Sequence, residues 1–334
     1  MKKFLFLFVL INFCFGSDES LVGYTKGVQV IEVRDRQTQI DSIEGVVYSQ
    51  IITTRSVKPL RMSLLIPRDN KLKPAILYFP GGGFSSADYT KFSQMRMALA
   101  QAGFVVAAVE YRVIPDMFPA LVIDAKSAVR YLRAHSKDFG IDPHRIGVMG
   151  DSAGGYLAQM AALSDDKAFE KGDFLNEKSN IQSVVTIYGL SNLLNIGEGF
   201  SQKVQKVHQS PAVTEALLVN GIAFRDFAGA SIISDPKKAL YASPMGHIKG
   251  KKPPFLIMHG SADTLVSPNQ SKQLYEALIK EGNQAEYILL KGANHGDNSW
   301  YQEEVIHIVV DYFKKTLGVP VNTTIKKSDP KDNL

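Results

Sequence analysis

The sequence predicts an α/β protein: a mostly parallel central sheet flanked by helices, with a small helical cap. Short apolar runs alternate with amphipathic stretches from Pro74 to the C-terminus, which is typical of buried parallel strands joined by helical crossovers. At 334 residues the chain is long enough for one such domain. Residues 190–247 interrupt the alternation with helix-like pieces and no strong strand, and we interpret them as the cap.

Buried strands are expected where a short apolar run is bounded by turn residues. From Pro74 onward such runs lie at 74–80, 104–110, 146–149, 184–188, 255–258 and 285–289. Helical spacing occurs at 89–102, 118–135, 271–281 and 302–317, and a further helix is expected from Ala153. Nearer the N-terminus, strands of an antiparallel opening are predicted at 27–33, 46–50 and 61–67.

Residues 1–16 have the pattern of a secretory signal peptide. Two lysines precede an apolar run at 4–15, and Cys14 and Gly16 fit a cleavage site before Ser17. The apolar run of about a dozen residues is too short to cross a membrane core that needs ~20. We therefore expect an exported bacterial protein, periplasmic or secreted, with no stable membrane span after cleavage.

The mature domain is expected at 17–318, with the cap inserted at about 190–247 and a polar flexible tail at 319–334. Removing residues 1–16 takes away two lysines and no acid, so the formal net charge falls from +5 to +3. That charge is too small to indicate nucleic-acid binding. The only cysteine, Cys14, leaves with the signal, which excludes disulfides, thiolate metal sites and a cysteine nucleophile.

The strongest chemical signal is the sequence Gly-Asp-Ser-Ala-Gly at 150–154, between the strand expected at 146–149 and the helix expected from Ala153. Its glycines allow a sharp strand-to-helix turn from which Ser152 projects at the edge of the sheet. The N-terminus of the following helix favours negative charge at the same place. Glycines and serines also form ordinary turns, but the strand–turn–helix context favours Ser152 as a nucleophile.

A serine nucleophile needs a base, and in this arrangement the chain order is serine, acid, histidine. His295 lies in the glycine-bounded loop 292–296, directly after the strand expected at 285–289, and is our candidate base. The other histidines precede Ser152, lie in the cap segment, end a strand or belong to the last helix: His135, His144, His208, His247, His259 and His307.

The candidate acid is Asp263, which follows the strand expected at 255–258 in the equivalent loop one crossover earlier. Aspartate is also a common turn residue. Asp297 is the rival acid, but it follows His295 by two residues and is in the wrong chain order. Buried beside the imidazole, Asp263 would select its tautomer and stabilise the imidazolium formed as Ser152 attacks.

Backbone N–H groups must stabilise the oxyanion of a tetrahedral intermediate. The three glycines 81–83 follow the strand expected at 74–80, and their backbone can approach a substrate closely because no Cβ intervenes. Ala153, directly after the nucleophile, supplies another N–H. A flexible turn would explain one glycine here but not three in succession.

Together these segments resemble the hormone-sensitive-lipase-like esterases of the α/β-hydrolase fold and their acetyl-xylan and feruloyl esterase relatives. The similar segments are LYFPGGGF (77–84), EYR (110–112), PDMFPALVID (115–124), GIDPHRIGVMGDSAGG (140–155), HGSADTLV (259–266) and GANHG (292–296). The resemblance covers about residues 60–317. It implies a triad and an oxyanion hole made by the following residues: Ser152, Asp263 and His295, and the N–H groups of Gly82, Gly83 and Ala153. It also suggests Asp124 as a conformational support near the entrance loops.

One position departs from the family pattern. The family has a histidine before its three glycines, where this sequence has Pro80. That histidine supports the oxyanion loop and takes no part in the chemistry. The triad is therefore unaffected, while the orientation of the loop needs another explanation, for which the rigidity of proline is one candidate.

The resemblance implies a serine carboxylic ester hydrolase that forms an acyl-enzyme, acts on small-molecule or carbohydrate-linked esters, and needs no cofactor or metal. We expect short acyl groups. Phe200, Phe224 and Phe227 of the cap segment are candidates to roof a small pocket beside Ser152, although packing within the cap explains them equally well.

Two other functions stay open. An amide hydrolase of the same fold, arylformamidase-like or peptidase-like, would use the same residues, because function depends on the site rather than on the fold. A peptidase usually needs a large extra domain, and residues 17–60 are too short for one. An inactive binding relative would have a broken triad, whereas all three members are present. The acyl and alcohol groups of the substrate and the oligomeric state cannot be derived from the sequence.

Overall fold

The computed structural model describes residues 18–34 and 37–320, which belong to two units divided after Gln37. Residues 18–34 contain one short 3-10 turn, Asp18–Ser20, and no strand. The strand predicted at 27–33 is therefore wrong. A strand needs a partner for its backbone N–H and C=O groups, and no described strand pairs with this segment, whose apolar side chains are exposed. The predicted signal peptide, and the tail beyond residue 320, lie outside the described residues.

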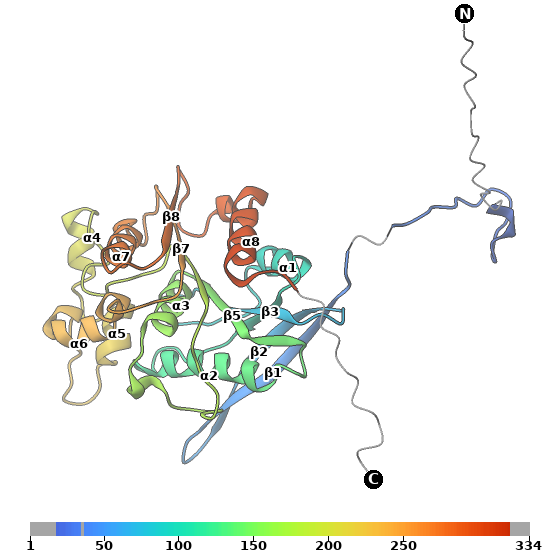
Figure 1. Ribbon diagram of the computed structural model, residues 1–334. Coiled ribbons are helices and arrows are strands. Elements are labelled where there is room, and N and C mark those ends of the chain that lie inside the picture. The colour runs from blue at the N-terminus through green and yellow to red at the C-terminus, as the bar shows by residue number, and fades with distance from the viewer. Residues whose placement is uncertain (1–17, 35–36, 321–334) are drawn as a thin grey trace, which may run out of the picture. The chain divides into compact units, whose positions relative to one another are not determined.

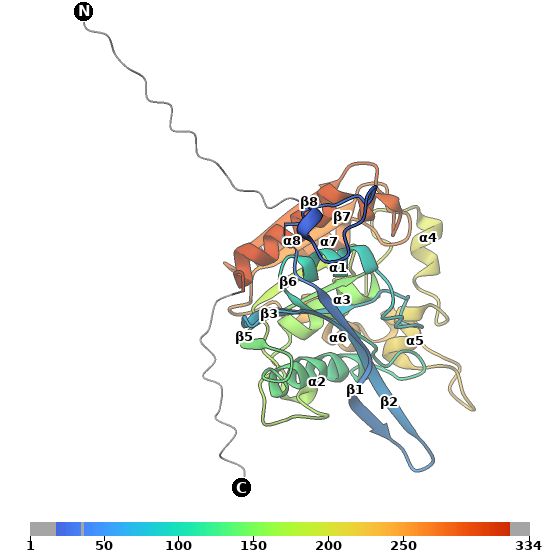
Figure 2. The ribbon, with the colours of Figure 1, turned by 90° about the vertical axis from the view of Figure 1, so that its right-hand side faces the viewer.

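An eight-stranded sheet forms the centre of the second unit (Figure 1). Its strands lie in the order β1-β2-β4-β3-β5-β6-β7-β8. Their bounds are β1 (Ile40–Ile52), β2 (Val57–Pro67), β3 (Lys73–Phe79), β4 (Val105–Val109), β5 (Ile141–Asp151), β6 (Ser183–Ile187), β7 (Phe255–Gly260) and β8 (Ala285–Leu290). The pairs β1–β2 and β2–β4 are antiparallel and all other pairs are parallel. Both the antiparallel opening and the parallel sheet are confirmed. The long β1–β2 hairpin extends past the helices (Figure 2).

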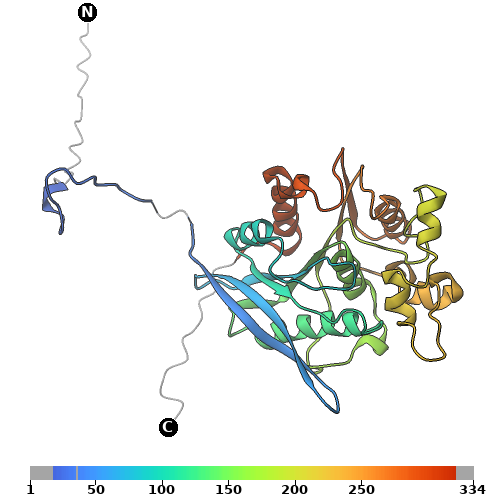
Figure 3. The same cartoon turned by 180° about the vertical axis from the view of Figure 1, so that it is seen from behind.

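Helices cover both faces of the sheet, as the alternating pattern predicts (Figure 3). On one face lie α1 (Ser93–Gln101) and α8 (Glu303–Leu317). On the other lie α2 (Ala120–Ala134), α3 (Ala153–Leu163) and α7 (Asn269–Lys280). No helix within 18–34 or 37–320 is long and apolar enough to cross a membrane.

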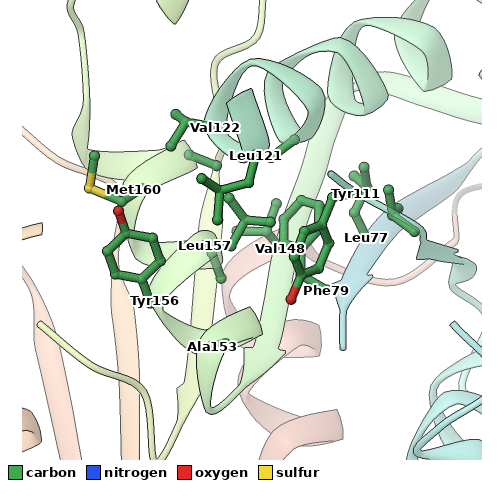
Figure 4. Packing of buried hydrophobic residues seen from close by; sticks show 14 of the residues in the cluster. Leu77, Phe79, Tyr111, Leu121, Val122, Val148, Ala153, Tyr156, Leu157 and Met160 are labelled. Carbon is green, nitrogen blue, oxygen red and sulfur yellow. The ribbon is translucent and has the colours of Figure 1, made fainter. Parts of the chain in front are cut away.

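The alternation of side chains along β3 shows how both faces are filled. Leu77 and Phe79 belong to the hydrophobic core beneath α2 and α3, whereas Ile76 and Tyr78 belong to the core beneath α1 and α8. In the first core, side chains of the sheet interdigitate with Leu121 of α2 and with residues of α3 (Figure 4). Because both faces are covered, the central strands β3 and β4 are buried along their whole length. The two cores hold the carboxyl ends of the parallel strands at one rigid edge.

Residues 190–247 form the helical excursion that the sequence predicts between β6 and β7. They contain α4 (Gln202–Val207), α5 (Thr214–Asn220), α6 (Pro236–Tyr241) and two 3-10 turns, Ile232–Ser234 and Pro244–His247. Hydrogen bonds tie the segment to the body of the domain. The hydroxyl of Tyr156 on α3 donates to the carbonyl of Ala242 at 2.6 Å, and Ser191 Oγ donates to the carbonyl of Gln270 on α7 at 2.7 Å.

Candidate active site

Ser152 stands at the turn between β5 and α3 in a backbone conformation that few residues adopt. Its φ is 54° and its ψ is −122°, a region that costs about 1–3 kcal/mol for a residue with a side chain. The turn is tight enough that a Cβ at Gly154 would collide with the carbonyl oxygen of Phe79 on β3. The glycine of the motif is thus required by the close approach of helix to strand, and the strained turn projects Ser152 from the sheet edge.

The structure brings His295 and Asp263 to Ser152 from the loops after β8 and β7. His295 Nε2 lies 2.9 Å from Ser152 Oγ, and His295 Nδ1 lies 2.7 Å from Asp263 Oδ2. An ionised carboxylate can only accept, so Nδ1 carries the ring proton and Nε2 is left to accept from the serine hydroxyl. This is the orientation in which an imidazole can remove the serine proton.

Asp263 is fully buried and fully hydrogen-bonded. Its Oδ1 accepts from the backbone N–H groups of Leu265 and Val266, each at 2.9 Å. Burial by itself raises the pKa of Asp263, but hydrogen bonds from His259, His295 and the backbone outweigh it and hold the pKa well below its usual range. The carboxylate therefore stays ionised beside the imidazole.

His259, which the sequence analysis placed only at the end of a strand, takes part in holding the acid. Its ring is fully buried, with Nε2 3.3 Å from Asp263 Oδ2 and Nδ1 2.7 Å from Ser271 Oγ on α7. Asp263 thus lies between two imidazoles. The signal in the sequence was the spacing of four residues from His259, at the end of β7, to Asp263 in the loop that follows.

Asp297, the rival acid, hydrogen-bonds within its own loop. Its carboxylate accepts from the N–H groups of Asn294 at 2.6 Å and Ser299 at 2.9 Å. The hydrogen bond from the Asn294 backbone is the main reason that the pKa of Asp297 is lowered. Asp297 therefore shapes the loop that presents His295, while the imidazole donates its hydrogen bond to Asp263.

Two aromatic rings hold the imidazole from the side. The ring of Tyr188, at the end of β6, lies 4.5 Å from that of His295, and Trp300 packs edge-on against Tyr188 at 4.7 Å. Trp300 Nε1 donates to the carbonyl of Asn294 at 2.7 Å. Tyr188 has a φ of 39°, a second strained residue at this edge. No motif marked either aromatic residue in the sequence.

The predicted oxyanion donors have free N–H groups. Within residues 37–320, no protein acceptor takes a hydrogen bond from the N–H of Gly82, Gly83 or Ala153. A Cβ at Gly82 would collide with the backbone of Ser86, so the loop can turn this tightly only with glycine there. Free N–H groups on both sides of a nucleophile are what a developing oxyanion requires.

The loop before these donors is anchored by side chains, which explains how it tolerates Pro80. The hydroxyl of Tyr111 donates to the Pro80 carbonyl at 2.6 Å, and the N–H of Gly81 donates to Asp151 Oδ1 at 2.9 Å. Tyr78 also donates to that oxygen at 2.7 Å. Burial raises the pKa of Asp151, against the effect of these bonds. The sequence suggested that the rigidity of Pro80 holds the loop. The hydrogen bonds from Tyr111 and to Asp151 hold it as well.

A cleft of about 510 Å³ opens beside Ser152. It is lined by Gly81, Gly82, Gly83, Thr90, Lys91, Phe92, Ser93, Gln94, Asp151, Ser152, Tyr188, Leu265, His295, Gly296 and Tyr301. These residues come from the loops at the carboxyl edge of the sheet and from the start of α1. The cap segment contributes none of them.

The expectation that Phe200, Phe224 and Phe227 roof this cleft is therefore wrong. Phe224 and Phe227 are 69% and 41% exposed on a short turn of the cap segment. The segment packs sideways against the body, where the N–H of Phe118 donates to the carbonyl of Leu218 at 2.9 Å. The aromatic walls of the cleft are instead Phe92, Tyr188 and Tyr301, which have no distinguishing pattern in the sequence.

Asp124 hydrogen-bonds to one arginine and to none of the groups around Ser152. It is buried on α2, where it accepts from the backbone N–H of Arg112 at 2.8 Å and from both Nε and Nη2 of the same guanidinium. Burial raises the pKa of Asp124, and the bonds from Arg112 oppose the rise. The pair ties the chain after β4 to α2.

Three features together define the α/β-hydrolase fold. They are a parallel sheet with an antiparallel opening, a serine on a strained turn between strand and helix, and an acid and a histidine from two later loops. Within this fold the chain belongs to the BD-FAE family, whose sequence profile matches residues 62–278.

Comparison with individual proteins agrees with this placement. The chain is 28% identical over 214 residues to the probable carboxylic ester hydrolase LipM of Mycobacterium tuberculosis, covering 63% of this chain and 46% of that protein. It is also 28% identical over 240 residues to the isoprenylcysteine alpha-carbonyl methylesterase ICME of Arabidopsis thaliana, covering 71% and 54%. The chain thus spans about half the length of these relatives. A solved structure of a truncated carbohydrate esterase from gut microbiota superposes with a TM-score of 0.70 at 22% identity, over 85% of this chain and 98% of that one, which shows the fold alone.

Proposed function

We propose that this protein is a serine carboxylic ester hydrolase that uses Ser152 as nucleophile, His295 as general base and acid, and Asp263 as the acid of the triad. The observation that carries the proposal is the unbroken chain of hydrogen bonds from Ser152 Oγ through His295 to the buried Asp263, at 2.9 and 2.7 Å. The esterase names of the relatives support the same reaction class.

In the first half of the reaction, Ser152 Oγ attacks the ester carbonyl carbon while its proton passes to His295 Nε2. The carbonyl oxygen becomes an oxyanion, which the N–H groups of Gly82, Gly83 and Ala153 stabilise. The carboxylate of Asp263 stabilises the imidazolium. When the tetrahedral intermediate collapses, the bond to the alcohol oxygen breaks, His295 gives that oxygen the proton, and the acyl group stays on the serine.

In the second half, water attacks the acyl carbonyl carbon and gives its proton to His295 Nε2. The same N–H groups stabilise the second oxyanion. Collapse breaks the bond to Ser152 Oγ, which takes the proton back from the imidazolium, and the carboxylic acid leaves. The triad and the oxyanion donors supply every proton transfer and charge contact in this cycle.

We also propose a preference for short acyl groups. Each methylene that is removed from water contributes about 0.8 kcal/mol to binding, so long chains need an apolar channel. The cleft beside Ser152 offers Leu265 as its one aliphatic side chain among the lining residues, and that residue is exposed. Much of the remaining lining consists of glycine and polar side chains. A palmitoyl chain would therefore gain little here.

A substrate panel on the purified mature protein tests the proposal. We expect p-nitrophenyl acetate and butyrate to be cleaved with a higher kcat/KM than laurate or palmitate, with no increase in rate above the solubility limit of the ester. Acetylated xylan and methyl ferulate extend the panel to carbohydrate-linked and aromatic esters. Faster turnover of N-formylkynurenine than of any ester would favour an amide hydrolase instead.

The Ser152→Ala variant is the matched control, because it removes one oxygen. It should fold normally, lose nearly all activity and resist labelling by a fluorophosphonate. Retention of even a tenth of the wild-type turnover would show that the nucleophile lies elsewhere.

We further propose that residues 1–16 direct export from a bacterial cell. The support is the sequence pattern of two lysines, an apolar run and small residues before Ser17. Expression of the full chain in a bacterium, followed by N-terminal sequencing of the periplasmic and medium fractions, should find a mature protein that begins at Ser17. Intact protein confined to the cytoplasm would contradict export.

A further inference from the structure

Two consecutive peptide units lead into the proposed oxyanion hole, and they are held differently. The unit from Pro80 to Gly81 is held on both sides, by a tyrosine hydroxyl on its carbonyl and by Asp151 on its N–H. The unit from Gly81 to Gly82 is held on one side only. Its carbonyl accepts a hydrogen bond from Lys91 Nζ at 3.1 Å, whereas the N–H of Gly82 has no acceptor among residues 37–320.

The bond from Lys91 determines the direction of that free N–H. A trans peptide is planar, and its C=O and N–H point in opposite directions. The cis bonds of the described residues precede Pro115 and Pro119, so the unit from Gly81 to Gly82 is trans. Glycine on both sides of the unit offers little resistance to its rotation. The ammonium on the carbonyl side therefore fixes the direction in which the N–H points.

The backbone of Lys91 is itself anchored to α1. Arg96 donates from Nε to the carbonyl of Lys91 and from Nη2 to that of Thr90, both at 2.8 Å, and from Nη1 to Ser63 Oγ at 3.1 Å. The arginine is only 8% exposed, so water competes little for these bonds. The lysine stem thus starts from a fixed point, which lowers the entropy lost when its ammonium binds the Gly81 carbonyl.

The charge of Lys91 also acts on the cleft. Lys91 lines the cleft together with Ser152, and its charge lowers the pKa of the nearby Asp151, although burial raises that pKa more strongly. In the proposed reaction, negative charge appears on the substrate oxygen only in the transition state. A cation hydrogen-bonded to the carbonyl of the donor peptide favours that charge.

We infer that Lys91 is a positioning residue of the oxyanion hole: its ammonium orients the peptide unit from Gly81 to Gly82, and its charge stabilises the same transition state. The inference rests on the proposed function. It also explains what replaces the supporting histidine of the family beside Pro80. Because Lys91 acts through the peptide, its loss should lower kcat and leave KM nearly unchanged.

The test compares Lys91→Met, Lys91→Gln and Lys91→Arg with Lys280→Met, which makes the same change at an exposed lysine of α7 that does not line the cleft. Removing a whole oxyanion donor costs ~10²–10³ in kcat, and a misdirected donor should cost less. We expect Lys91→Met to lower kcat for p-nitrophenyl acetate about tenfold with KM within about twofold. The Ki of a reversible trifluoromethyl ketone, which forms a tetrahedral adduct, should rise by the same factor as kcat/KM falls.

Lys91→Arg should retain most of the wild-type kcat, because it keeps a charged donor. The kcat of Lys91→Gln should lie between those of Lys91→Arg and Lys91→Met. Lys280→Met should resemble the wild type, and all variants should have the same melting temperature. An unchanged kcat in Lys91→Met, or a loss confined to KM, would overturn the role of Lys91. If the wild type is active and Ser152→Ala is not, that result leaves the proposed function intact; a wild type that cleaves no ester would overturn both.

Discussion

The two halves of the candidate site are held by different means. On the acid–base side, the loops after β7 and β8 bring Asp263 and His295 together through side-chain hydrogen bonds in a buried setting. On the oxyanion side, the loop after β3 presents backbone N–H groups and is held by residues from three other segments: Tyr111, Asp151 and Lys91. In the first half, most hydrogen bonds to the two loops come from residues nearby in sequence, such as Val266 and Asn294. The second is assembled from distant parts of the chain.

This difference determines how each half should fail. No other group can replace a side chain that transfers protons, so its removal should abolish nearly all activity. Several side chains orient the backbone donors of the oxyanion loop. The loss of one such side chain should therefore lower the activity only in part. Substitutions on the two sides should therefore differ in size and in their effect on kcat and KM.

The largest effects are expected on the acid–base side. His295→Ala should lower kcat on the order of 10⁴-fold or more, and Asp263→Asn about 10³–10⁴-fold, because the base is lost or held in the wrong tautomer. Asp297→Asn should cost less than about tenfold, since its bonds serve only the loop. Steady-state kinetics on p-nitrophenyl acetate measures all three. A larger loss in Asp297→Asn than in Asp263→Asn would reverse the assignment of the acid.

On the oxyanion side, Asp151→Ala should lower kcat by on the order of tenfold to a hundredfold, less than the loss of a whole triad member. It removes the acceptor for the N–H of Gly81 and leaves the hydroxyl of Tyr78 without its partner. Asp151→Asn is the matched control, because its amide oxygen can still accept both bonds. Equal losses in the two variants would mean that the charge of Asp151, not its bond to the loop, matters.

A smaller effect is expected for Pro80→Gly, with kcat falling a few-fold and more than KM rises. The Tyr111 and Asp151 bonds remain in this variant and limit the loss. The Tyr111→Phe substitution removes the hydrogen bond to the carbonyl of residue 80. In the double variant, the fold-loss in kcat should exceed the product of the fold-losses of the two single variants. Simple multiplication would mean that rigidity and hydrogen bonding act independently on the loop.

The smallest effect concerns stability. The pKa of Asp263 is lower in the folded protein than its usual value, which is about 3.9 in an unfolded chain. Its ionised form thus stabilises the fold fully above about pH 4, and this contribution is lost as the pH falls through the lower folded value. The melting-temperature difference between wild type and Asp263→Asn, on the order of a few degrees, should be constant from pH 5 to 7 and shrink below pH 4. A difference that grows on acidification would contradict the lowered pKa.

The sequence alone determined the sheet from β3 onward, the elbow at Ser152, and the loops that carry Asp263 and His295. These features are local: an apolar run, a glycine turn and a polar side chain at a strand end are each written within a few residues. Because parallel strands end at one edge, local placement was enough to predict that Ser152, His295 and Asp263 would meet, and the structure brings them together.

Only the tertiary structure decided what holds these residues and what surrounds them. The bonds to the oxyanion loop, the Tyr188 ring beside His295, and the aromatic walls Phe92 and Tyr301 depend on contacts between segments far apart in sequence. The cap segment was predicted as an excursion, but its packing away from the cleft follows from contacts such as Phe118 with Leu218. The failed strand at 27–33 has the same cause, since a strand needs a partner that local pattern does not reveal.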